Sequence, residues 1–188
     1  MSPAEAFDIL RSALEQAEIR YAIGGSWAST AFGEPRFTND VDILAEVTQE
    51  NLAVFLRHLP ETFYADEEEA LNAIRRGRPF NVIHMPTVLK FDLFPSSAFP
   101  IGSEELDRAV SLEDTGLSKG PAWFVTPEDI LLAKLHWFKL GGQVSEVQWR
   151  DIMGIVRGCS ATLDRAYLER AASQLEVRDL LHRSLGQV

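Results

Sequence analysis

Gly24-Gly25-Ser26 and Asp40-Val41-Asp42 are the two segments from which this sequence is most readily interpreted. Side chains two residues apart on a strand point to the same side, so we expect Asp40 and Asp42 to share one face while Val41 points into the core. Two neighbouring carboxylates repel each other unless a cation lies between them. Because both ligands are oxygens, the pair predicts a site for Mg²⁺ or Mn²⁺, with a solvated strand edge as the alternative.

A third aspartate, Asp92, lies in the otherwise apolar segment Lys90-Phe91-Asp92-Leu93-Phe94. A charge in the middle of a strand is unfavourable unless it faces a partner, a metal or water. If this strand is a neighbour of the first, Asp92 completes a site of three carboxylates. Metal ions held in this way activate an attacking hydroxyl and stabilise a leaving pyrophosphate, although an exposed strand residue would give the same pattern.

The glycine pair supplies a complementary feature. Glycine lets the backbone approach a ligand closely, and a helix that begins at Ser26 directs free N–H groups at that ligand, which favours phosphate. The Ser26 hydroxyl is a further candidate for phosphate contact. Gly24, Gly25 and Ser26 therefore predict a phosphate cradle, whereas a plain turn is the simpler interpretation of two glycines taken alone.

Composition limits the class of protein. The chain has 188 residues, of which 46% are hydrophobic and 24% are charged, as is usual for a soluble globular domain. The net charge of −10 disfavours a broad nucleic-acid-binding face but leaves room for a small basic pocket. Cys159 is the single cysteine, which favours a reducing compartment. With no secretory signal and no run of about 18 apolar residues, we expect a cytoplasmic protein without a membrane segment.

Hydrophobic periodicity and turn residues predict an α/β (α+β) protein with a small mixed β-sheet flanked by helices. We expect an α/β domain over residues 1–122 and a C-terminal helical region, residues 123–188, packed on it. Residues 95–103 are the expected flexible loop. The expected strands are 21–23, 40–46, 80–85, 87–94, 110–112 and 123–125, and the expected helices are 3–18, 26–33, 48–59, 66–76 and 126–140, followed by two or three more.

Gly24-Gly25-Ser26, the stretch Arg36-Phe37-Thr38-Asn39-Asp40-Val41-Asp42 and the later Asp92 together resemble the nucleotidyltransferase superfamily of the DNA polymerase β type. The resemblance is closest to its bacterial branch of AbiEii-like toxins and small uncharacterised nucleotidyltransferases. It covers residues 20–94 well and residues 126–156 more loosely. It implies transfer of a nucleoside monophosphate from Mg-NTP to an acceptor hydroxyl or phosphate.

The resemblance also implies roles for individual residues. Gly25 and Ser26, with Gly24, contact phosphate. Asp40 and Asp42 are metal ligands, and Asp92 is a metal ligand and general base. For the two remaining motif residues we expect phosphate contact from Arg36 and a supporting hydrogen bond from Thr38.

The helical half contributes Lys134 and Asp151. Lys134 lies within an apolar stripe, from which it either extends into solvent or reaches a bound triphosphate. Asp151, beside Arg150, lies at a place where the resembled branch carries an acidic residue of the cleft, and an ion pair between helices is the alternative. Trp137 is expected in the core between helices, and His136 at the surface.

Two functions remain open. The first is an active nucleotidyltransferase that uses an NTP and Mg²⁺, with an RNA end such as tRNA, a protein or a small molecule such as an aminoglycoside as acceptor. The second is a non-catalytic module that binds a nucleotide or a partner protein, for example a toxin–antitoxin component. The presence of all three carboxylates favours the first. A glycosyltransferase with an Asp-x-Asp site fits the glycine pair poorly.

Overall fold

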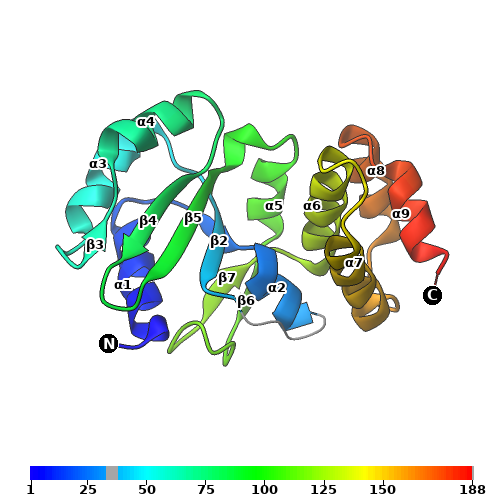
Figure 1. Cartoon of the computed structure of the whole chain (residues 1–188), viewed down its shortest axis with the longest axis horizontal. Coiled ribbons are helices and arrows are strands. Elements are labelled where there is room, and N and C mark those ends of the chain that lie inside the picture. The colour runs from blue at the N-terminus through cyan, green and yellow to red at the C-terminus, as the bar shows by residue number, and fades with distance from the viewer. Residues whose placement is uncertain (33–37, 188) are drawn as a thin grey trace.

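The computed structural model describes residues 1–32 and 38–187. Within these residues, seven strands form one mixed sheet in the order β3-β4-β5-β2-β1-β7-β6, with helices around it (Figure 1). The strands are β1 (Tyr21–Ile23), β2 (Asp40–Ala45), β3 (Phe63–Tyr64), β4 (Phe80–His84), β5 (Leu89–Pro95), β6 (Val110–Leu112) and β7 (Ala122–Phe124). The helices are α1 (Pro3–Gln16), α2 (Gly25–Phe32), α3 (Gln49–His58), α4 (Glu67–Arg75), η1 (Ser96–Ala98), α5 (Gly102–Arg108), α6 (Pro127–Leu140), α7 (Glu146–Cys159), α8 (Arg165–Gln174) and α9 (Arg178–Leu185).

The centre of the sheet is the pairing of β2 with its two neighbours. β2 runs antiparallel to β1 and parallel to β5, and Val41 and Ile43 of β2 lie in register with Phe91 and Leu93 of β5. These four side chains are fully buried, because alternation along both strands turns them to the same face. Helix α1 covers this face, and its Phe7 ring centroid lies 6.4 Å from that of Phe91.

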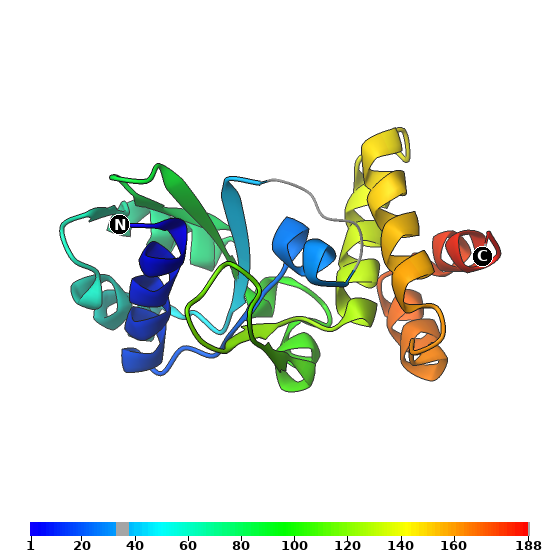
Figure 2. The same ribbon diagram turned by 90° about the horizontal axis from the view of Figure 1, so that it is seen from below.

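Four helices follow the last strand and form a group of their own beside the sheet, as Figures 1 and 2 show. The first of them, α6, begins at Pro127 because the Thr126 side chain accepts a hydrogen bond from the Asp129 N–H, which caps the helix. Helix α2 packs against β2 on one side and against α6 and α7 on the other. It therefore joins the sheet to the helical group.

The expected fold class, a mixed sheet flanked by helices, is confirmed. The expectation of a loop over 95–103 is wrong, because η1 and the first residues of α5 occupy this segment. Ser96, Ile101 and Gly102 are buried there, and the Gly102 backbone approaches the Ser96 carbonyl too closely for any side chain. The short strand β3 had no clear sequence signal, and the expected end of the second helix at Gly33 lies outside the described residues.

None of the helices in the described part of the chain combines the length and the apolar character required to cross a membrane.

Burial in the central strands predicts a contrast between two leucines. Leu93 of β5 is fully buried, whereas Leu140 at the end of α6 is 61% exposed. Leu93→Ala should lower the free energy of unfolding by about 2–5 kcal/mol, because it leaves a cavity in the core. Leu140→Ala should change it by no more than about 0.5 kcal/mol. Urea unfolding of both variants tests this, and similar losses in the two would contradict the placement of β5.

Candidate active site

Two aspartates face each other across the central strands. In the parallel ladder, Asp42 of β2 pairs with Asp92 of β5, and Asp40 pairs with Lys90. Neighbouring strands lie about 4.8 Å apart, so the Asp42 and Asp92 carboxyl groups are next to each other on one face. The predicted convergence of the Asp-x-Asp pair and Asp92 is therefore present in the backbone register.

Both carboxyl groups of this pair are partly buried. Burial raises the pKa of the Asp42 carboxyl, the nearby Asp92 and Asp40 raise it further, and Lys134 and Lys90 oppose the change. The Oδ1 atom of Asp92 is buried and has no hydrogen-bond partner among the described residues. A buried carboxylate oxygen without a partner is unfavourable, so this atom points to a ligand that the protein itself does not provide.

Lys90 is a residue of this site that the sequence analysis did not assign. Its Nζ lies 3.0 Å from Asp92 Oδ2 and 3.6 Å from Asp40 Oδ2, and these carboxylates raise the pKa of its ammonium group. The signal was present in the sequence, because alternation puts Lys90 and Asp92 on the same face of one strand. The ammonium group offsets part of the repulsion among the three carboxylates.

The glycine pair is held against the same carboxylate. The Gly24 N–H donates to the Asp42 carbonyl at 2.9 Å, and Gly25 has φ of +54°. A Cβ atom at Gly25 would overlap with the Asp42 carboxylate, so both the backbone conformation and the close approach require glycine. The start of α2 is thereby fixed beside Asp42, with Ser26 in its first turn.

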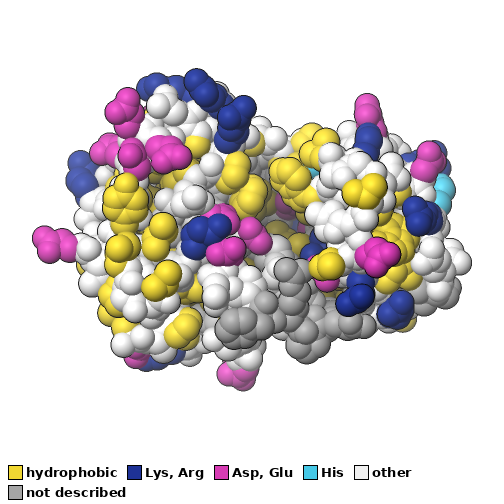
Figure 3. Space-filling model, viewed as in Figure 1, with side chains coloured by type: hydrophobic (Ala, Val, Ile, Leu, Met, Phe, Trp, Pro, Cys, Tyr) yellow, Lys and Arg dark blue, Asp and Glu magenta, His cyan; other side chains and the backbone are white. Residues whose placement is uncertain are grey.

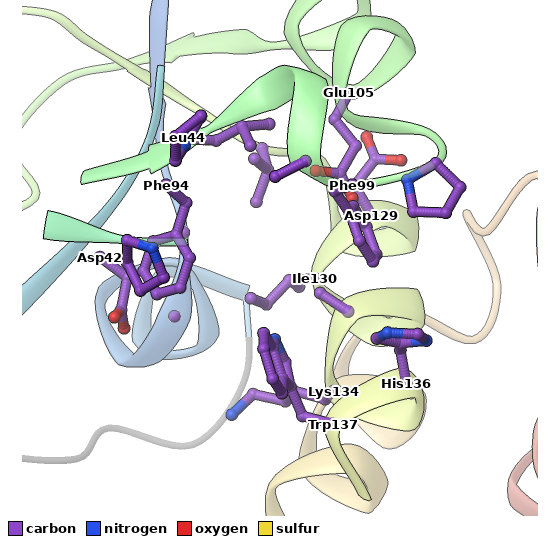
Figure 4. Close-up of a pocket in the computed structure, with 18 of the residues that line it drawn as sticks. Asp42, Leu44, Phe94, Phe99, Glu105, Asp129, Ile130, Lys134, His136 and Trp137 are labelled. Atoms are coloured by element: carbon purple, nitrogen blue, oxygen red, sulfur yellow. The ribbon is translucent and has the colours of Figure 1, made fainter. Parts of the chain in front are cut away.

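A cavity of about 560 Å³ lies between the sheet, α5 and α6, a size typical of small-molecule sites. Figure 3 shows the corresponding hollow between the two parts of the molecule, and Figure 4 shows side chains that enter it. Of the predicted site residues, five line it: Gly24, Gly25, Ser26, Asp42 and Lys134.

The other predicted residues lie around this cavity. The Lys134 Nζ is 3.0 Å from Asp151 Oδ2 on α7, so the ion pair between helices that was the alternative is present. The Thr38 hydroxyl accepts from the Asp40 N–H at 3.2 Å, which orders the start of β2. Arg36 lies outside the described residues. Arg150, beside Asp151, is exposed and lines a separate hollow along α7.

Two expectations about α6 are corrected. Trp137 is not in the core: it is 51% exposed and lines the cavity. His136 is only half-exposed and also lines the cavity, with its ring edge-on to Phe99 at 5.3 Å between centroids. Both follow from the position of α6, which presents this face to the cavity and its opposite face to the helical group. Helical periodicity identifies an apolar face, but does not tell what that face contacts.

The residues present suit a divalent cation that is bound together with a nucleotide. Among the described residues, no three acidic, histidine or cysteine side chains are arranged as a preformed metal site. Mg²⁺ commonly takes one or two protein carboxylates, with phosphate oxygens and water as its other ligands. Asp42 and Asp92, with the unpartnered Oδ1 atom of Asp92, match that smaller set. Asp40 as a third ligand stays a prediction.

Solved structures of similar fold are nucleotidyltransferase-like proteins. An antigenic nucleotidyltransferase-like protein from Paracoccidioides brasiliensis matches with a TM-score of 0.56 and 18% identity, over 98% of this chain and 93% of that one. The antibiotic-resistance factor ANT(2'')-Ia matches with a TM-score of 0.52 and 16% identity, over 96% of this chain and 91% of that one. No protein-family model and no curated protein matches the sequence. The chain therefore has the nucleotidyltransferase fold, as its sequence motifs led us to expect.

Because Gly25 packs against Asp42, an alanine at this position should clash with that carboxylate. A second glycine with positive φ but no close neighbour allows the clash to be separated from backbone strain. Gly116 also has positive φ, +77°, but an added Cβ there would meet nothing within 4 Å. Gly116→Ala should therefore cost only the backbone strain, about 1–2 kcal/mol. Gly25→Ala should cost about 1–3 kcal/mol more, because it displaces the Asp42 carboxylate. Equal losses in urea unfolding would show that Gly25 does not contact Asp42.

The raised pKa of Asp42 predicts that this residue lowers stability at neutral pH. A carboxyl group whose pKa is higher in the folded state favours folding only while it is protonated, so its ionisation costs stability as pH rises through that pKa. Asp42→Asn should raise the free energy of unfolding at pH 7 by about 1 kcal/mol. The gain should shrink below the ordinary pKa of 3.8, where the wild-type carboxyl is protonated too.

The measurement is thermal unfolding in the presence of a chelator. Glu113→Gln, the same loss of charge at an exposed site, is the control and should leave stability nearly unchanged at both pH values. A loss of stability in Asp42→Asn at pH 7 would show that the carboxylate is stabilising in the metal-free protein.

Proposed function

We propose that this protein is a metal-dependent nucleotidyltransferase, which moves a nucleoside monophosphate from an NTP to an acceptor hydroxyl. The observation that carries the proposal is the register of Asp42 with Asp92 beside a glycine-formed helix start. A phosphate-binding backbone and paired carboxylates are the two components that phosphoryl transfer needs. The shared fold with nucleotidyltransferase-like proteins supports it.

The transfer reaction assigns a task to each group. The acceptor oxygen forms a bond to the α-phosphorus, the bond from that phosphorus to the bridging oxygen breaks, and pyrophosphate leaves. The proton of the acceptor hydroxyl passes to the Asp92 carboxylate, which acts as general base. Asp42 and Asp92, with Asp40 as a third ligand, would hold Mg²⁺ or Mn²⁺, which would supply positive charge to the phosphates when bound.

Backbone and side-chain groups around the cavity position the nucleotide. The N–H groups at the start of α2, together with Gly24, Gly25 and the Ser26 hydroxyl, contact the phosphates. Lys134, which lines the same cavity, provides a positive charge for the triphosphate, and Asp151 holds its ammonium group in place. We assign Arg36 to phosphate contact and Thr38 to the ordering of Asp40.

Nucleotide binding tests this proposal without knowledge of the acceptor. Thermal unfolding is measured with each of the four NTPs, with and without Mg²⁺. An NTP at 100 times its dissociation constant stabilises a protein by about 2.7 kcal/mol, which raises the melting temperature by about 5–10 °C in a chain of this size. We expect such a rise with at least one NTP, dependent on Mg²⁺, and its loss in Asp92→Asn.

The Glu113→Gln variant serves again as the control and should keep the full rise. If the NTP still raises the melting temperature of Asp92→Asn, the Asp42–Asp92 pair does not take part in nucleotide binding. If none of the NTPs has an effect in the wild type, the proposal is wrong.

A second function is favoured by the contacts of Lys90. Its ammonium group lies between Asp40 and Asp92, where a positive charge is needed. A protein that uses this lysine in place of a metal would bind a nucleotide or a partner protein without transfer, as a toxin–antitoxin component can. Nucleotide stabilisation that does not depend on Mg²⁺ would favour this function over the first.

A further inference from the structure

One end of the cavity contains a buried carboxyl group with an oxygen atom that no described residue contacts by a hydrogen bond. Glu105 of α5 is 4% exposed and lines the cavity. Its Oε1 atom is buried and, within the described ranges, has no hydrogen-bond partner. Figure 4 shows the side chain close to Asp129 and Phe99, away from the Asp42 end of the cavity. Burial and the nearby Asp129 raise the pKa of Glu105 well above its usual range.

The neighbouring Asp129 differs, because its own carboxylate is fully partnered. It accepts hydrogen bonds from the Tyr167 hydroxyl and, at 2.6 Å, from the Thr126 hydroxyl. The Arg108 Nε lies 3.5 Å from Asp129 Oδ2. Asp129 therefore has a structural role, and adds a negative charge to the field at Glu105.

The nearby cations of the described residues have other partners. Arg108 also pairs with Glu128 at 3.3 Å and stacks on the Tyr167 ring at 3.7 Å. Lys134, the cation of the cavity wall, pairs with Asp151 at 3.0 Å. A buried carboxyl group that is ionised beside a second acid and without a cation destabilises the fold. Among the described residues no cation contacts Glu105, so this position suits a ligand that brings a positive charge.

The walls of this end suit a positively charged group. Phe99 contributes an aromatic ring beside Glu105 and Asp129 (Figure 4), and a cation is attracted to the face of such a ring. His136 completes this wall, and burial lowers the pKa of its ring, so it adds no competing positive charge. The net charge of the whole chain, −10, attracts cations over a longer range.

We propose that Glu105 binds an ammonium group of the acceptor, and that the acceptor is a small molecule which carries both an amine and a hydroxyl. The amine pairs with Glu105 beside Phe99 at one end of the cavity. The hydroxyl then lies toward the carboxylate end, where the nucleotide is attacked. The part that concerns the hydroxyl rests on the proposed nucleotidyl transfer, whereas the amine site stands on Glu105 alone.

A matched set of sugars tests the amine site. Glucosamine, glucose and N-acetylglucosamine differ at one position, which is an ammonium group, a hydroxyl or a neutral amide. Binding to the full-length wild type is measured by calorimetry and thermal unfolding at neutral pH. We expect glucosamine to bind about tenfold more tightly than either neutral sugar, the size of one charge-assisted hydrogen bond.

Two variants of α5 test whether Glu105 causes the preference for glucosamine over the neutral sugars. Glu105→Gln keeps the shape of the side chain and should abolish the preference for glucosamine. Glu104→Gln removes a charge from the adjacent residue, which faces away and pairs with Arg170, and should keep it. Both variants should retain the Mg-NTP stabilisation of the wild type. If Glu105→Gln does not fold, the comparison of the three sugars in the wild type still decides.

Equal binding of glucosamine and glucose by the wild type, or no binding of either, would overturn the amine site. So would a preference for glucosamine that persists in Glu105→Gln. The two proposals fail separately. A glucosamine preference without any NTP effect would retain the amine site and reject nucleotidyl transfer, and an NTP effect without the preference would do the reverse.

Discussion

The parallel pairing of β2 with β5 is the constraint on which the site depends. It places Asp42 beside Asp92, although two partly buried carboxyl groups repel each other. On the opposite face, the same ladder buries Val41 with Phe91 and Ile43 with Leu93. A shift by one residue would expose that apolar set and bury the charges. The hydrophobic face thus fixes the register, and the register holds the carboxylates together against their repulsion.

The start of α2, which we propose contacts phosphate, is coupled to this pair through one glycine. Gly25 is the first residue of α2, and the Asp42 carboxylate fills the space where its side chain would be. The helix start therefore cannot move relative to Asp42 without a change in the strand. Because α2 also packs against α6 and α7, the position of the helical group depends on the same contact. The sheet, the start of α2 and the cavity form one connected unit.

Features that depend on neighbouring residues in the sequence could be predicted, whereas features that depend on tertiary packing could not. Alternation within β2 and β5 was enough to predict the shared faces of Asp40 and Asp42 and the candidacy of Asp92, because it is a local property. Lys90 could have been found in the same way. Glu105 could not, since Glu104-Glu105 resembles any acidic first turn, and its burial comes from the contact of α5 with the cavity. Trp137 was misplaced for a similar reason, since the partner of a helix face is set by tertiary packing.

The cavity has two ends with opposite requirements, and this polarity limits what can occupy it. At one end, the proposed phosphate contacts of the glycine backbone and Lys134 lie beside Asp42, whose repulsion from Asp92 a cation would relieve. At the other end, Glu105 and Asp129 lie beside Phe99. Under the proposed function, a bound metal–triphosphate would balance the first end but would provide no partner for Glu105. Burial and Asp129 raise the pKa of Glu105 and favour its neutral form, whereas a cationic group beside it would favour the ionised form. An acceptor with an ammonium group would therefore complement the second end while the nucleotide occupies the first.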